Sequence, residues 1–567
     1  MSGEFQVLGQ NPSAQFTLKI HRGDGMAMLA MDWKNGKPPM NFVGFAIQYT
    51  DPASSQMHTL QNRLNFADTP NPKGLRMFPT SEAPIQKFRW VHFPRQAMPA
   101  GKLTYHVKPV FMDDKLKLTY GAEQTAELEL TRDTYPGQLN VAYTRGFIFS
   151  QAFVDKYKTI AGLLPPESAG SLDFKPSVPY ADDAYAWMGF EARAAILDVL
   201  DKAILDTDAQ VRVVAYDLNE PEIVSRLVKL GQRLKVIIDD SKDHKKAGSS
   251  ENKAAKELIE SAGAANVKRE HMGSLQHNKF IAVAGSVQLA VCGSTNFSWR
   301  AFYVQSNNAI VFTGAATVKL FFDAFESYWK SSKVADFGKT TAATWRDIGL
   351  SGIDAKIAFS PHSAKNALLK SIADDMLNST SSVLYSLAFL YETSGPIRDA
   401  IKKLTKNADR FVYGMSDKKV GGITLQKPNG NLVPLYPTAL TGKDTPEPFK
   451  SEPKAGTGTR MHHKFVVIDF NKPTARVYVG SYNFSKPADL ANGENLLVIR
   501  DRRIAVSYAV EAMSMLDHYH FRVLQLEAKK SKKKLELSRP PSKPGEKAWW
   551  EEDFTDIEKI RDRQLFS

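Results

Sequence analysis

The first part of the chain alternates apolar and polar positions in short runs, with Gly, Pro, Asn and Asp residues between them. This pattern is typical of β-strands that bury one face and are joined by tight turns. The strand-like runs cover residues 16–20, 26–33, 42–49, 88–93, 103–111 and 124–131. Their number and spacing predict an all-β domain over residues 1–138, folded as a β-sandwich.

From residue 139 onwards the pattern changes to alternating helical and strand-like segments. The helical patterns cover 190–205, 220–231, 254–262, 364–377 and 395–404, and the strand-like runs cover 211–216, 234–238, 383–390 and 410–414. This alternation predicts α/β sheets flanked by helices. It occurs twice, so we expect two α/β halves that span residues 139–345 and 346–528.

Two segments depart from these patterns. Residues 416–459 are rich in Lys, Pro and Gly, so they form either a substrate-facing loop or a disordered insertion. Residues 529–567 begin with a lysine run and continue into a proline-containing linker, which predicts a basic C-terminal tail. In this tail, Trp549 and Trp550 either pack on the body of the protein, the interpretation we favour, or stack on nucleobases.

Composition and charge narrow the class of protein. Cys292 is the only cysteine, which excludes an intramolecular disulfide, a cysteine zinc site and a disulfide-bearing immunoglobulin domain. The N-terminal sandwich is therefore expected to be a disulfide-free one, of immunoglobulin or fibronectin-III type. It shows no catalytic cluster, so we expect it to dock an unknown protein or ligand, or to be structural.

The net charge of +13 favours a polyanionic partner. Nucleic acid is the first expectation, and an anionic phospholipid surface is the alternative. The sequence shows no signal peptide and no apolar run long enough for a transmembrane segment, so we expect a cytoplasmic protein.

Candidate chemistry lies at the strand ends of residues 461–499. A His-x-Lys sequence precedes one apolar strand, the next strand ends in Gly-Ser-x-Asn, and a carboxylate precedes the third. The polar residues at these positions are His462, Lys464, Asp469, Ser481, Asn483 and Glu494. The pattern places a histidine, a lysine, an asparagine and a carboxylate at the ends of neighbouring strands.

The same pattern occurs earlier, in residues 276–312. The matching residues are His277, Lys279, Ser294 and Asn296. Two positions differ, because Ala284 stands where the second copy has an aspartate and Asn307 stands where it has a glutamate. Such a set of residues is far less probable by chance in two copies than in one, which favours a catalytic role for both.

Two such sets brought together could cleave a phosphodiester. A neutral imidazole is a competent nucleophile at phosphorus, and a second, protonated histidine can donate to the leaving alkoxide. Lys279, Lys464, Asn296 and Asn483 could stabilise the charge that develops on the phosphoryl oxygens, with Ser294 and Ser481 as substrate-binding residues. The scheme requires no cofactor or metal, and adjacent His462 and His463 point to opposite faces of a strand, so they would not share one.

Residues 140–525 resemble the phospholipase D superfamily, whose signature is the HxKx4D motif followed by GSxN. The second copy is most similar to the bacterial endonuclease branch. The resemblance implies that two motif copies meet at a pseudo-twofold interface, and that Glu494 orients a catalytic histidine. By that analogy we expect His462 to have an anionic partner, and His277 at best the amide of Asn307.

Three functions remain open at this point. The first is a metal-independent phosphodiesterase, a nuclease, that works through a phosphohistidine. The second is a phospholipase D-type lipid phosphodiesterase or transphosphatidylase with the same chemistry. The third is a scaffold whose first motif has degenerated. The sequence does not decide which histidine is the nucleophile.

Overall fold

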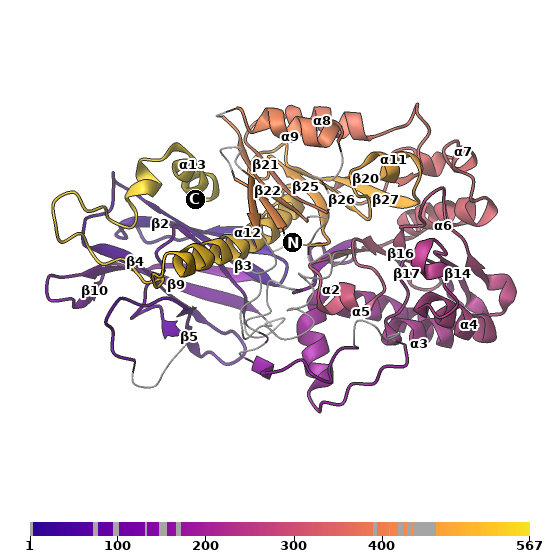
Figure 1. Cartoon of the computed structure of the whole chain (residues 1–567), viewed down its shortest axis with the longest axis horizontal. Helices are drawn as coiled ribbons and strands as arrows, with labels where there is room; N and C mark the ends of the chain where they lie inside the picture. The colour runs from indigo at the N-terminus through magenta and orange to yellow at the C-terminus, as the bar shows by residue number, and fades with distance from the viewer. Residues whose placement is uncertain are drawn as a thin grey trace. The chain divides into compact units, whose positions relative to one another are not determined.

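The computed structural model divides into two compact units, Met1–Arg132 with Val506–Ser567, and Asp133–Ala505. It describes all residues except 1–3, 72–76, 95–100, 131–132, 147–152, 154–155, 166–171, 389, 391–393, 408, 418–422, 428–431 and 436–460. The chain is therefore a mixed α/β protein with β-sheets at its N-terminus (Figure 1).

The first unit contains two antiparallel sheets. One has the order β1 (Gln6–Leu8), β2 (Phe16–Gly23), β3 (Met26–Trp33) and β8 (Arg89–His92). The other has the order β10 (Leu118–Tyr120), β9 (Lys102–Met112), β4 (Phe42–Thr50) and β5 (Met57–Thr59), with β11 (Gln124–Glu129) also on β9. The short strands β6 (Gln61–Asn62) and β7 (Phe78–Pro79) pair with each other.

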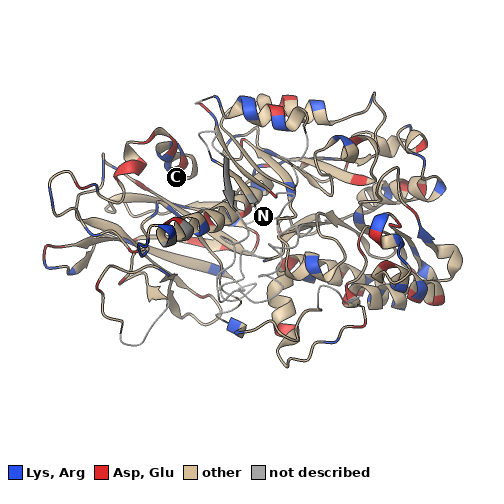
Figure 2. Cartoon of the chain, viewed as in Figure 1, with Lys and Arg blue, Asp and Glu red and all other residues tan. Residues whose placement is uncertain are grey.

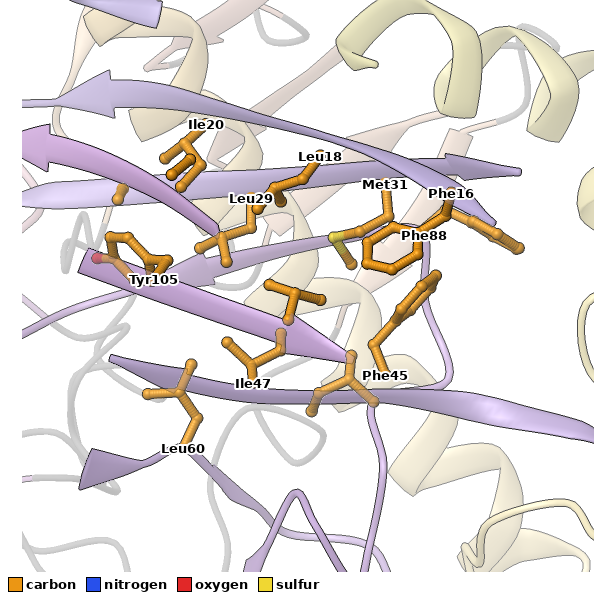
Figure 3. Close-up of a cluster of buried hydrophobic side chains, with 14 of the residues drawn as sticks. Phe16, Leu18, Ile20, Leu29, Met31, Phe45, Ile47, Leu60, Phe88 and Tyr105 are labelled. Carbon is orange, nitrogen blue, oxygen red and sulfur yellow. The ribbon is translucent and has the colours of Figure 1, made fainter. Parts of the chain in front are cut away.

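Side chains from both sheets form one hydrophobic core (Figure 3). Phe16 and Leu29 from the first sheet lie in the same cluster as Phe45 and Tyr105 from the second. Buried and exposed residues alternate along β9 and β11, as expected for strands with one face toward a core. The expectation of strands here is confirmed, whereas the immunoglobulin or fibronectin-III type stays a prediction.

The C-terminal residues complete this core. Trp550 belongs to this core, and only 3% of its surface is exposed. The ring of Trp549 stacks on Phe88 with centroids 5.3 Å apart, and its Nε1 donates to the backbone oxygen of Phe42. Both tryptophans therefore pack on the body of the protein, which is the interpretation that we favoured. The predicted boundary at residue 528 falls inside α12 (Arg502–Lys530), and α13 (Ile557–Phe566) follows the tryptophans.

The second unit contains two mixed sheets. The first has the order β12 (Leu139–Tyr143), β18 (Asn308–Thr313), β17 (Gln288–Gly293), β16 (Lys279–Ala284), β13 (Gln210–Ala215), β14 (Leu234–Ile238) and β15 (Val267–Arg269). The second has the order β19 (Arg346–Asp347), β20 (Asp354–Ser360), β27 (Glu494–Arg500), β26 (Arg476–Gly480), β25 (Lys464–Ile468), β21 (Ser382–Leu387), β22 (Phe411–Asp417), β23 (Ile423–Gln426) and β24 (Leu432–Leu435).

The two sheets repeat one arrangement at their centres. Strands β18-β17-β16-β13-β14 and β27-β26-β25-β21-β22 have the same order, with the last pair parallel and the others antiparallel. The repeat supports two α/β halves, and the pseudo-twofold relation between them stays a prediction.

Helices accompany both sheets. They are α2 (Ala181–Leu205), α3 (Pro221–Leu230), α4 (Ser250–Ala262), α5 (Trp299–Tyr303), α6 (Ala315–Lys330), α7 (Val334–Phe337), α8 (Leu369–Leu377), α9 (Pro396–Leu404) and α11 (Lys486–Leu490). Helices α8 and α9 pack their apolar side chains against β21, β22 and β25 (Figure 1). None of the helices in the described part of the chain has the length and apolar character that a membrane crossing requires.

Part of the predicted loop at 416–459 is a regular structure instead. Strand β22 extends to Asp417, and β23 and β24 continue the sheet as an antiparallel hairpin. Lys and Pro weaken a strand pattern, which is why the sequence did not show this hairpin. The rest of the predicted substrate-facing or disordered loop, residues 418–422, 428–431 and 436–459, lies outside the described residues.

Candidate active site

The two His-x-Lys motifs lie at the same sheet position in each half. Lys279 is the first residue of β16, and Lys464 is the first residue of β25. The Gly-Ser-x-Asn sequences follow β17 and β26, which run antiparallel to these strands. The start of one strand and the end of its neighbour share an edge, so each histidine lies near its own Gly-Ser-x-Asn.

The first residue of each Gly-Ser-x-Asn sequence must be glycine, because the backbone of the next strand leaves no room for a side chain. Gly293 and Gly480 have φ of 144° and 155°, which side-chain-bearing residues rarely adopt. A Cβ at Gly293 would overlap the backbone oxygen of Asn308, and one at Gly480 would overlap that of Asn495. This contact fixes the loop that carries Ser294 or Ser481 against the next strand.

The motif edges of the two halves meet. Isolated parallel bridges join Gln276 to Gly493 and Ser306 to Met461, so a residue beside each motif histidine pairs with the other half. The predicted residues His277, Lys279, His462 and Lys464 are brought together and are each 6% exposed or less. The structure therefore forms one composite, buried site.

The anionic partner of the histidines differs from our expectation. Glu494 Oε2 lies 2.7 Å from Nδ1 of His277, which belongs to the other half. His462 Nδ1 instead lies 2.8 Å from Oδ1 of Asn307. The expectation that Glu494 would serve His462 is wrong, because each partner reaches across the interface rather than back to its own motif.

The motif serines hold these partners in place. Ser294 Oγ donates to Asn307 Oδ1 at 3.0 Å, and the hydroxyl of Ser481 bonds Glu494. Their backbone oxygens accept from the histidines, Ser294 from His462 at 3.1 Å and Ser481 from His277. Both serines are buried and engaged inside the protein, a different role from the substrate contact that the sequence suggested.

The asparagines complete the predicted set. Asn296 is buried and Asn483 is half-buried. Asn296 Nδ2 donates to Asp217 Oδ2. In the part of the chain that the structure describes, the Oδ1 atoms of Asn296 and Asn483 have no hydrogen-bond partner. These amides are therefore placed at the site with hydrogen-bonding capacity to spare.

Burial and mutual repulsion shift the pKa values of the basic groups. Burial lowers the pKa of Lys279 to about 7 against the opposing charge of Glu494, and burial with the charge of Lys279 lowers that of Lys464 well below its usual value. Burial and the two lysines also hold the pKa values of His277 and His462 well below 6.5. A bound anion would raise all four, so the site is electrostatically suited to one.

Burial acts on Glu494 in the opposite sense. It raises the pKa of this carboxyl to about 8, while the charge of Lys279 acts to lower it. When Glu494 is ionised it can only accept, so the His277 proton lies on Nδ1 and Nε2 keeps its lone pair.

The motif aspartate has a structural role. The carboxylate of Asp469 accepts from the backbone nitrogens of Thr380, Ser381 and Ser382 at the start of β21. Where the first half has Ala284, Asp206 accepts from the backbone nitrogens after it, at Ser286 and Val287. This carboxylate comes from the C-terminal end of α2, in the connection to β13, so the loss of the motif aspartate does not leave the turn without an anchor.

Sequence reasoning missed four residues beside the first motif. Asp239 Oδ1 accepts from the backbone nitrogen of Gln276, directly before the histidine. The ring of Tyr216 lies 4.6 Å from that of His277, and Lys279 Nζ lies 4.8 Å from the Tyr216 ring. Asp217 and His244 are the other two. A polar residue at the end of a buried strand is the signal that could have found Tyr216, Asp217 and Asp239, whereas His244 lies in the short helix Lys242–Lys245 and carries no such signal.

His244 joins two of these carboxylates. Its Nδ1 lies 2.8 Å from Asp239 and its Nε2 lies 3.1 Å from Asp217. Against the opposing effect of burial, these bonds raise the pKa of His244 to about 10. Asp217, His244 and Glu251 place ligand atoms within 4.8 Å of one another, as a metal site would. A protonated His244 already accounts for this arrangement, because both ring nitrogens then donate to carboxylates.

A family model described as "Cardiolipin synthase, PLD-like domain" matches residues 200–329 and 424–516. These segments contain both His-x-Lys and both Gly-Ser-x-Asn sequences, the same residues that form the composite site. These two segments of the chain therefore belong to the phospholipase D superfamily.

Other members of the phospholipase D superfamily match shorter parts of the chain. Proteins named "Phospholipase D" from Rickettsia felis and Rickettsia prowazekii are each 45% identical over 47 residues, 8% of this chain. The match spans 22% and 21% of those proteins, about a fifth of their length.

Solved structures are similar at lower identity. Nuc from Salmonella typhimurium, a phospholipase D family member, is 24% identical and covers 24% of this chain and 87% of its own, with a TM-score of 0.20. A phosphatidylserine synthase from Haemophilus influenzae is 12% identical and covers 60% of this chain and 92% of its own, with a TM-score of 0.41.

Proposed function

We propose that this member of the phospholipase D superfamily is a phosphodiesterase that cleaves nucleic acid through a phosphohistidine. One observation carries the proposal. Two buried histidines lie close enough to two buried lysines to feel their charge, and Nδ1 of each histidine is bonded from the opposite half, in one case by a carboxylate and in the other by an amide. The net charge of +13 supports a polyanionic substrate. Lys and Arg residues are interspersed with Asp and Glu residues, as on α4 and α8 (Figure 2). The argument from charge therefore rests on the net charge of the chain and not on a single basic patch.

His277 is the proposed nucleophile. When its Nε2 bonds to phosphorus and the leaving group departs, the ring becomes cationic, and the Glu494 carboxylate stabilises that charge through Nδ1–H. Asn307 offers His462 only a neutral acceptor, so His462 is less basic and gives up a proton more readily.

The reaction then proceeds in two balanced steps. In the first, the phosphorus–oxygen bond to the leaving alkoxide breaks as the Nε2–phosphorus bond forms, and protonated His462 gives its proton to the alkoxide. In the second, neutral His462 takes a proton from water, whose oxygen attacks phosphorus and releases His277. The charge on the phosphoryl oxygens is stabilised in both steps by Lys279 and Lys464 and by amide hydrogens, those of Asn483 Nδ2 and the one of Asn296 Nδ2 that is not donated to Asp217. The scheme therefore requires no metal.

The test is cleavage of labelled single-stranded DNA, duplex DNA, RNA and phosphatidylcholine vesicles in EDTA. We expect wild type to cut nucleic acid, and His277→Asn and His462→Asn to lose at least a thousandfold in rate. Denaturation during turnover of a ³²P-labelled substrate should trap an acid-labile label on wild type and none on His277→Asn. A label that persists in His277→Asn and disappears in His462→Asn would reverse the assignment.

A lipid substrate is the second candidate. The curated relatives are named phospholipase D, and the family model carries the description cardiolipin synthase. The same site would cleave a phospholipid, or transfer its phosphatidyl group to an alcohol in place of water. Cleavage of the vesicles alone in the assay above would select this function. The scaffold alternative has less support, since Asp206 anchors the turn that lacks the motif aspartate.

Further proposals accompany this function. The two halves are related by a pseudo-twofold axis, and the N-terminal sheets form an immunoglobulin- or fibronectin-III-like sandwich that docks an unknown protein or ligand. The second motif belongs with the endonuclease branch, and the protein acts in the cytoplasm. The repeated strand order supports the first of these proposals, and the shared core of the two N-terminal sheets supports the second.

A further inference from the structure

Asp217 gives the first half of the site a carboxylate beside its motif lysine. It stands two residues after Ala215, which pairs with Lys279 between β13 and β16. Burial lowers the pKa of Lys279, and the charge of Asp217 is one of those that act against this effect.

Asp217 lies at the rim of the site. Its side chain is 23% exposed, while its Oδ2 accepts from the buried amide of Asn296. Its Oδ1 lies 3.1 Å from Nε2 of the protonated His244, which holds the carboxylate in this place. Asp217 thus reaches solvent and a candidate catalytic residue at the same time.

Asp217 also fixes the direction of the Asn296 amide. A carboxylate only accepts, so Nδ2 is the atom that faces it. The carbonyl Oδ1 of Asn296 is left buried, without a hydrogen-bond partner among the described residues. A buried acceptor of this kind needs a donor, and a bound substrate can supply one. The first half of the site therefore presents two acceptors beside its lysine.

This arrangement selects what may flank the scissile phosphate on that side. A carboxylate repels a second phosphate and favours a neutral group with a hydrogen-bond donor. In nucleic acid the donor next to the phosphate is the ribose 2′-hydroxyl, which DNA lacks. We propose that Asp217 and Asn296 recognise this hydroxyl, so that RNA is the preferred substrate. The proposal rests on the proposed nuclease function and adds its substrate class.

The experiment compares oligonucleotides of one sequence made of RNA, DNA and 2′-O-methyl RNA, with bis(p-nitrophenyl) phosphate as a small diester that carries no hydroxyl. The variants are Asp217→Asn and, as a matched control, Asp243→Asn, whose carboxylate is 84% exposed and pairs with Lys246. We expect wild type to prefer RNA over DNA at least tenfold in kcat/KM, and to treat 2′-O-methyl RNA like DNA. Asp217→Asn should reduce the preference to threefold or less, mainly through KM, while Asp243→Asn keeps the wild-type preference.

Three results would overturn the proposal. Equal cleavage of RNA and DNA by wild type would contradict recognition of the 2′-hydroxyl but would agree with the proposed nuclease function. A uniform loss on every substrate in Asp217→Asn would show that Asp217 only positions Asn296. Cleavage of the small diester alone would overturn the nuclease function, and recognition of RNA with it, while the phosphodiesterase chemistry stands.

Discussion

At the scale of single residues, the two histidines of the site differ in the group that bonds Nδ1, which is a carboxylate for His277 and an amide oxygen for His462. Glu494 follows the second motif in the sequence, so analogy assigned it to His462, but in the structure it contacts His277. Proximity in sequence says which residues reach the sheet edge. It does not say which of the two histidines they contact, because that depends on how the two halves pack. His277 and Glu494 are 217 positions apart in the sequence.

The exchange of partners leads to a first prediction. Asn307→Asp would give His462 a carboxylate and raise its pKa, so its proton-donating form would persist to higher pH. The alkaline limb of kcat against pH should move up by about 1 unit. The measurement is a pH–rate profile of Asn307→Asp beside Asn307→Ala, in which no upward shift is expected. An equal shift in both variants would mean that the limb does not belong to His462.

A second prediction concerns Lys279, whose pKa burial lowers to about 7. Inorganic phosphate prefers the protonated lysine, so its inhibition constant should rise as pH increases above 7 and Lys279 loses its proton. The constant is measured between pH 6 and 9. In Lys279→Met we expect weaker inhibition and a flatter dependence above pH 7. Unchanged steepness in that variant would assign the titration to another group.

At the scale of secondary structure, the alternating N-terminal runs and the central strands of both halves could be predicted. Strands such as β16 and β25 are apolar on both faces, and β9 alternates, so each burial pattern is visible in the sequence. The hairpin β23–β24 was missed because its strands are only four residues long, stand among Lys, Gly and Pro residues, and include a proline in β24. Asp217 was also missed, because aspartate is common in turns and a single aspartate after a strand does not indicate a functional site.

The third prediction tests the aspartate that joins two strands. Asp469→Ala leaves three backbone N–H groups at the β21 start without their acceptor, and that of Ser382 belongs to a buried residue, so the change should cost about 1–3 kcal/mol in the free energy of unfolding. Urea denaturation followed by circular dichroism measures this loss. Asp469→Asn, which keeps an acceptor oxygen, should lose less. Equal losses would show that the charge, rather than hydrogen bonding, stabilises the turn.

At the scale of the whole molecule, one unit carries all the candidate chemistry. Every residue assigned to the site lies within Asp133–Ala505. The fourth prediction is that this fragment folds and keeps phosphodiesterase activity within tenfold of the full chain, measured on bis(p-nitrophenyl) phosphate. The same fragment with His462→Asn is the control. A folded but inactive fragment would show that the other unit takes part in catalysis.

The other unit is discontinuous in sequence, and this has a consequence for synthesis on the ribosome. Its N-terminal strands are translated before Asp133–Ala505, but Trp550 and the rest of its core from Val506–Ser567 are translated after that segment. Domains generally fold as they leave the ribosome, and exposed apolar surface promotes aggregation in the meantime. Part of the core of the nascent N-terminal sheets therefore stays uncovered while Asp133–Ala505 is synthesised. We expect them to be the segment of the newborn chain that chaperones hold longest.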